Sequence, residues 1–243
     1  MRTWQSKFAR LAATGLLAAI PHATGWASSF SVTPVRVELS SGKLTSVVKV
    51  NNASDESLMM QVSVLRWTTD GEKNIYSPVD DILLNPPVFN VPAHATQVLR
   101  LGLRKFKGAP DEQAYRLIVA EVPGPLPVGF VGLRTIVRVS IPIFITLPAA
   151  IAQLSWEAKR DAAGALIVTA VNQGHAHMQI RGMDLVGGQS TERQNKTLND
   201  YLLPGQKHEW KFDVPQLRES LQIDLTAKTD TEDVHAHLAV AGR

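Results

Sequence analysis

Two pairs of histidines are the clearest candidates for chemistry in the sequence. His175 and His177 are separated by one residue, and so are His235 and His237. Alternate residues of a strand point to the same face, so each pair could offer two imidazole ligands to a metal ion. A structural zinc site usually has four ligands, and the chain has no cysteine to supply the rest. We therefore interpret these histidines as surface or half-buried strand residues, and we expect no metal and no other cofactor.

Motifs of known catalytic machinery are missing from the sequence. It contains no nucleophile elbow, phosphate-binding loop or dinucleotide-binding fingerprint. Asp80 and Asp81 are adjacent, and adjacent residues of a strand point to opposite faces, so they are poorly placed to share an acid–base site. A metal-dependent hydrolase that uses the histidine pairs stays open as an alternative, but it needs a third ligand and a base. We expect a protein that is not an enzyme.

Two arginines stand alone among apolar neighbours. Arg36 lies between two valines, and Arg138 lies between Val137 and Val139. Each arginine is either a residue of a solvated strand face or part of an anion site. A guanidinium fork matches the geometry of a carboxylate, such as the C-terminus of a peptide. Nucleic acid is not expected as a partner, because the net charge is only +3 and the basic residues are scattered.

The strand around Arg138 is unusually long and apolar. From Val131 to Pro148 the sequence reads "VGLRTIVRVSIPIFITLP", and eight of the nine odd positions from 131 to 147 are apolar. This period of two predicts a strand. Pro142 has no backbone N–H, which points to an edge strand or to a strand that changes partners there. A long apolar edge is a hazard unless it is covered, so this one is either covered in the fold or exists to be paired.

The rest of the chain predicts an all-β protein. Short alternating runs, for example Thr96 to Leu103 and about Ala114 to Val122, are separated by turn residues at roughly eight to twelve positions, which is typical of β-sandwiches. The apolar phase changes parity at Pro34, as in a strand that leaves one sheet and joins another. We expect Trp67, Trp156 and Trp210 to pack in the sandwich cores.

The N-terminus has the features of a secretory signal. Three basic residues precede a ten-residue apolar run, Leu11 to Ile20, which is too short to span a membrane as a helix. Small residues at Gly25 and Ala27 favour cleavage near Ala27, with a site after Ala23 as the second choice. We predict an exported protein without a membrane anchor. Its parts are a signal peptide (1–27), an N-terminal domain (28–148) and a C-terminal domain (149–243).

Four segments in order resemble the periplasmic chaperones of the chaperone–usher pathway, which assemble pili and other surface fibres. The segments are "VTPVRVEL", "NPPVFNVPAHATQVLRL", "EQAYRLIVAEVPG" and "LRTIVRVSIPIFI". Together they cover most of residues 30 to 150, and the second domain matches only in outline. The run "R-x-S-I-P-x-F" is similar to that of the divergent chaperones that serve spore-coat-like and archaic fibres.

This resemblance implies two immunoglobulin-like β-sandwich domains in an L-shaped arrangement, without enzymatic activity. It implies that the last strand of the first domain lends apolar side chains to a fimbrial subunit that lacks a strand, a mode known as donor-strand complementation. It also implies delivery of the subunit to an outer-membrane usher. The donor positions that match are Val131, Leu133, Val137, Val139 and Ile141, with Thr135 as a polar interruption.

The resemblance further implies that a cleft arginine holds the C-terminal carboxylate of the subunit. Arg36 matches that position in the first strand. Many members have a lysine as second anchor, where this chain has Pro142, so Arg138 is the substitute that we expect. Self-association through the edge strand stays open. The alternative is an exported two-domain binding module for a carbohydrate or envelope component, which would need an aromatic platform, although aromatic residues make up only 6% of the chain.

Overall fold

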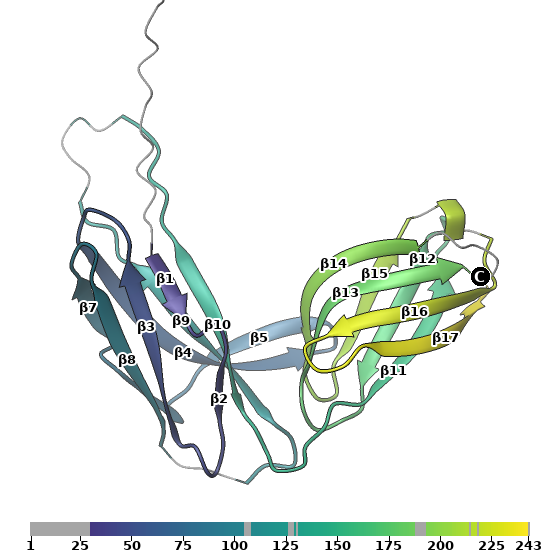
Figure 1. Cartoon of the computed structure of the whole chain (residues 1–243), viewed down its shortest axis with the longest axis horizontal. Helices are drawn as coiled ribbons and strands as arrows, with labels where there is room; N and C mark the ends of the chain where they lie inside the picture. Colours follow the sequence, from purple (N-terminus) through teal and green to yellow (C-terminus); the bar gives the residue numbers. More distant parts are fainter. Residues whose placement is uncertain are drawn as a thin grey trace, which may run out of the picture.

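The computed structural model describes residues 30–104, 108–125, 129, 131–187, 193–213, 215–217 and 219–242. Within these ranges the regular elements are all strands, apart from one short 3₁₀ turn, η1 (Pro215–Leu217). The prediction of an all-β protein is confirmed. The strands form two lobes that meet at an angle, in agreement with the predicted L shape (Figure 1).

The first lobe is a sandwich of two sheets. Its strands are β1 (Phe30–Thr33), β2 (Val37–Leu39), β3 (Thr45–Asn52), β4 (Leu58–Asp70), β5 (Lys73–Pro78), β6 (Ile82–Asn85), β7 (Val88–Val91), β8 (Thr96–Leu103), β9 (Gln113–Glu121) and β10 (Arg138–Ile145). One sheet has the order β1-β3-β8-β6, and the other has the order β2-β10-β9-β4-β5, with β7 paired to β4. Alternate residues of both sheets fill one core between them, among them Val50, Leu99 and Leu117.

The parity change at Pro34 has the predicted consequence. Strand β1, before the proline, pairs with β3 in the first sheet, and β2, after it, pairs with β10 in the second sheet. The chain therefore crosses between the sheets at this point. The crossing places Arg36 at the start of β2, beside the last strand of the lobe.

The second lobe is built from one continuous path of seven strands. They are β11 (Leu154–Arg160), β12 (Leu166–Asn172), β13 (Met178–Gly187), β14 (Arg193–Leu202), β15 (Lys207–Phe212), β16 (Gln222–Thr229) and β17 (Val234–Ala241), in the order β14-β13-β16-β17-β11-β12-β15. A parallel pairing of β11 with β17 joins the two halves of the path. Apolar residues of both halves, such as Val168 and Leu185, share one core.

Three predicted elements differ in detail. The strand expected from Val131 is shorter, because β10 begins only at Arg138. His175 and His177 lie in the turn between β12 and β13 rather than in a strand. Trp67 is buried, but it packs between the lobes and not in the core of the first sandwich. This last prediction is wrong because strand periodicity cannot tell which side of a sheet a second domain covers.

Two predictions concern segments outside this framework. The proposed signal peptide, residues 1–27, lies outside the described residues. The proposed domain boundary between Pro148 and Ala149 falls in the segment that connects β10 to β11. In the part of the chain that the structure describes, no helix is long and apolar enough to cross a membrane.

Candidate functional site

Strand β10 has an open edge along its first half. On one side it pairs with β9 over its whole length, from Arg138 to Ile145. On the other side β2 pairs only with Ile143 to Ile145. Pro142 lies where the pairing with β2 ends, in agreement with the expected change of partner there. The backbone from Arg138 to Pro142 therefore borders one strand only, and the opposite edge is available for another.

The chain before β10 continues this edge without a ladder of its own. The backbone N–H of Glu121 donates to the carbonyl of Val137 at 3.2 Å, at the point where β9 ends. Upstream of this bond, Val131 and Leu133 have exposed fractions of 97% and 92%. Large apolar side chains that lie so close together are seldom this exposed unless a partner covers them.

The apolar odd positions thus fall into three groups. Val131 and Leu133 are exposed, while Val137 and Val139 are half-buried. Val139 packs against the edge of the first core. Ile141 is only 2% exposed and belongs to the core of its own lobe. Its side chain is therefore committed to the fold of the free chain.

The even positions of β10 face the second lobe. Phe144 is buried, and its ring stacks on His177 with centroids 3.5 Å apart and planes 6° from parallel. The same face of the sheet carries Trp67, whose ring contacts Tyr201 edge-on at 5.8 Å. Leu203 completes this cluster from the second lobe. The apolar contact between the lobes holds the sheet that contains β10 against the turns of the second sandwich.

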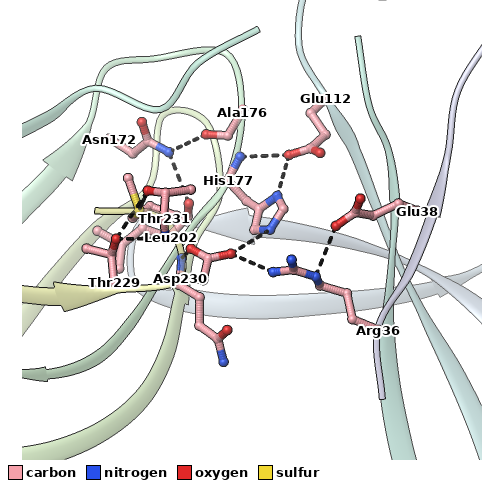
Figure 2. Close-up of polar contacts among 12 residues, drawn as sticks. Arg36, Glu38, Glu112, Asn172, Ala176, His177, Leu202, Thr229, Asp230 and Thr231 are labelled. Carbon is pink, nitrogen blue, oxygen red and sulfur yellow. Dashed lines mark hydrogen bonds and ion pairs between the residues drawn. The ribbon is translucent and has the colours of Figure 1, made fainter. Parts of the chain in front are cut away.

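A chain of charged groups lies beside this apolar cluster (Figure 2). Nη1 of Arg36 in the first lobe donates to Oδ2 of Asp230 in the second at 2.5 Å. The Nε atom of Arg36 forms an ion pair with Oε1 of Glu38 at 3.1 Å. Glu112 accepts two bonds on Oε2, one from the backbone N–H of His177 at 2.7 Å and one from its Nδ1 at 2.6 Å.

The imidazole of His177 connects the two halves of this network. A carboxylate only accepts hydrogen bonds, so the bond to Glu112 requires the proton on Nδ1. The other ring nitrogen, Nε2, is buried without a hydrogen-bond partner and lies 4.0 Å from Oδ2 of Asp230. Asp230 is further held by the backbone N–H of Gln179, which donates to Oδ1 at 3.1 Å.

The network shifts the pKa values of its central pair apart. Burial alone raises the pKa of Asp230, but the bonds from Arg36 and Gln179 and the nearby His177 outweigh it, and the pKa lies below its ordinary value. Burial likewise lowers the pKa of Arg36, but Asp230 and Glu38 outweigh it and raise the pKa. Both groups are therefore charged at neutral pH, and Arg36 is a permanent cation between the lobes.

The two arginines singled out in the sequence are not brought together. Arg36 precedes the pair of Val37 with Ile143, which places it level with Pro142. Arg138 is exposed and lies four residues earlier on β10, about 13 Å away along the strand at roughly 3.3 Å per residue. Both belong to the face that is turned toward the second lobe.

A different arginine lies level with Arg36. Arg116 of β9 pairs with Pro142, so Arg36, Pro142 and Arg116 form a row across three strands, with the two arginines about 10 Å apart. The guanidinium of Arg116 lies 3.7 Å from the ring centroid of Trp67. Burial lowers its pKa, although Tyr76 and Tyr201 partly oppose this shift. Sequence reasoning missed Arg116, although the quoted segment "EQAYRLIVAEVPG" contains it.

A family model described as "Pili and flagellar-assembly chaperone, PapD N-terminal domain" matches residues 29–152, just over half of the chain. The protein belongs to this family of assembly chaperones. The matched region contains the whole first lobe and all of β10. The predicted membership is confirmed, and so is the prediction that the protein is not an enzyme.

Solved structures of chaperones share the complete two-lobe fold. The chaperone is similar to a chain of the CsuC–CsuE complex of chaperone and tip subunit from the archaic Csu pili of Acinetobacter baumannii. The identity is 20%, the TM-score is 0.65, and the match covers 88% of this chain and 100% of that one. A chain of the complex of SafA pilin with the SafB chaperone from Salmonella enterica matches at 16% identity and a TM-score of 0.62, covering 86% and 96%. No curated protein sequence matches the chain.

The remaining candidates from the sequence have structural partners. His175 Nδ1 lies 2.6 Å from Asp111, and His237 Nδ1 lies 2.5 Å from Asp224. Among the described residues no group of three or more potential ligands could hold a metal ion. Asp81 is bonded to Arg66 rather than to Asp80. The structure therefore draws attention to the lobe interface and the edge of β10.

Proposed function

We propose that the chaperone binds a pilus subunit by donor-strand complementation, with the segment from Val131 to Val139 as the donor strand. The observation that carries this proposal is the exposure of Val131 and Leu133 next to the open edge of β10. An incomplete sandwich exposes an apolar groove and unpaired backbone groups, and a strand of this kind supplies both needs at once. Ile141 is left out of the proposed donor set because its own core holds it.

The energy available to such a strand is sufficient for a stable complex. Four apolar side chains, Val131, Leu133, Val137 and Val139, can be buried further, and full burial contributes about 1.5–3 kcal/mol for each side chain that starts exposed. The two half-buried valines contribute less. Ordering the segment before β10 opposes binding, by about 0.5–1.5 kcal/mol for each immobilised side chain. The backbone bonds to the open edge add specificity of register.

We further propose that Arg36 holds the C-terminal carboxylate of the subunit. It is a permanent cation on the face of β2 that is turned toward the second lobe, and it lies beside the donor strand. Arg138 stays part of this proposal as a second, exposed contact further along β10. Arg116, level with Arg36 across Pro142, is an additional candidate that only the fold brings into view.

The cellular setting follows from the family resemblance. We propose that the chain is exported to the periplasm, that its signal peptide is cleaved near Ala27, and that it delivers subunits to an outer-membrane usher. The alternative of a carbohydrate-binding module has less support. Trp67 and Trp210 are buried, so they cannot form the exposed aromatic platform that it requires.

Site-specific photo-crosslinking tests the donor-strand proposal. A benzophenone amino acid at position 133 should crosslink, in the periplasm, to a small pilus subunit that mass spectrometry identifies. The matched control places the same group at Leu221, which is 81% exposed in the second lobe. The donor assignment is wrong if both positions give the same products, or if the product of position 133 is not a pilus subunit.

A further inference from the structure

Arg36 already has two carboxylate partners in the free chaperone. Glu38 lies against Nε and Asp230 against Nη1 (Figure 2). A carboxylate that grips a guanidinium with two bonds uses Nη2 together with either Nε or Nη1. Since Nε carries a single hydrogen, its pairing with Glu38 competes directly with any external carboxylate that approaches the Nε–Nη2 edge.

The two resident carboxylates differ in how easily they can leave. The side chain of Asp230 is only 6% exposed, and the backbone N–H of Gln179 holds its second oxygen. The side chain of Glu38 is 49% exposed. A displaced Glu38 can be solvated by water, whereas a displaced Asp230 would stay buried as an unpaired charge. Glu38 is therefore the partner that can be exchanged, and Asp230 is the one that keeps Arg36 in place.

The local sequence keeps Glu38 beside Arg36. The residues are two apart in the chain, so they lie on the same face of the strand. Val37 and Leu39, on the opposite face, are fully buried in the first core. These two anchors fix which way β2 faces, so the Glu38 carboxylate meets Arg36 at a high effective concentration.

We propose that Glu38 is an intramolecular stand-in for the carboxylate of the subunit: it occupies Arg36 in the free chaperone and yields it on binding. This inference rests on the proposed role of Arg36 as the anchor. It makes Glu38 a specificity-determining residue. A carboxylate by itself must displace Glu38 and binds weakly, whereas a subunit that also takes up the donor strand has the additional binding energy to do so.

Sodium acetate, the smallest carboxylate probe, tests this inference on the intact chaperone. The side-chain Nε–H resonance of Arg36, identified by its loss in Arg36→Lys, reports acetate binding in an NMR titration, with acetamide as the uncharged control. Glu38→Gln removes the competing charge at constant shape and should tighten acetate binding two- to fivefold. Glu157→Gln, the same change of charge at an exposed position of β11, should leave it unchanged.

The outcomes separate this inference from the function on which it rests. Weaker or unchanged acetate binding in Glu38→Gln overturns the stand-in role, and so does an equal gain in Glu157→Gln, which reflects only the change in net charge. The photo-crosslink from position 133 does not involve Glu38, so its result stands in either case. Thermal unfolding of Glu38→Gln should match that of the parent chain, because the exposed pair contributes little to stability.

Discussion

Replacing Leu133 with Asp should abolish subunit binding and leave the free chaperone folded. The Leu133 side chain is 92% exposed and lies before the first residue of β10, so the folded chain loses no contact of consequence. Surface substitutions of this kind usually change the free energy of unfolding by less than about 0.5 kcal/mol. The melting temperature of the free variant should therefore stay close to that of the parent chain.

The complex should respond very differently. Burial of Leu133 in the groove of a subunit contributes about 1.5–3 kcal/mol, and this contribution is lost. Burial of a polar group without a partner costs a further ~1–3 kcal/mol by mutational data, and more for a charge. The sum of about 3–6 kcal/mol corresponds to a loss of affinity of roughly two to four decades.

Calorimetric titration of the chaperone with the crosslinked subunit, once identified, measures this loss. Two comparison variants make the result specific. Leu221→Asp, at an exposed site of the second lobe, should change neither binding nor folding. Ile141→Asp, at a core position, should unfold the first lobe. A Leu133→Asp variant that binds within about threefold of the parent, or that itself melts early, would refute the reasoning.

Three further predictions concern the lobe interface. For a synthetic peptide that ends in the last residues of the pilus subunit, Arg36→Ala should equalise binding of the acid and amidated forms, a loss of about one to two decades for the acid, and Arg36→Lys should restore part of it; an unchanged acid preference in Arg36→Ala would exclude the anchor. Asp230 has a lowered pKa in the folded chain, so its contribution to stability is complete above its ordinary value and is lost as the pH falls through the folded value. In urea unfolding, the stability difference between the parent and Asp230→Asn should therefore shrink from pH 6 to pH 3, and a constant difference would contradict this. Phe144→Ala should lower stability by about 3–5 kcal/mol by removing the buried ring stacked on His177, and a change below about 1 kcal/mol would show that the stacking is incidental.

The pattern of single strands could be predicted from the sequence because it depends on local periodicity. The alternation from Val131 to Leu147 indicated the phase that reaches the first core, and Ile141 and Ile143 do lie there. Pro34 and Pro142 restrict the backbone wherever they occur, so the sheet crossing and the change of partner could be inferred from these prolines alone. The exposure of Val131 and Leu133 could not, since it depends on where β9 ends.

The composition of the lobe interface was decided by the tertiary structure. Asp230 is 194 residues from Arg36, and the two meet only because the turn after β16 packs against β2. His177 looked like half of a metal pair, but the fold places its ring on Phe144 and its Nδ1 on Glu112. Contacts of this kind involve single residues from distant turns, so no local periodicity encodes them. The sequence indicated which strand has the open edge, and only the packing of the two sandwiches determined which charges surround Arg36.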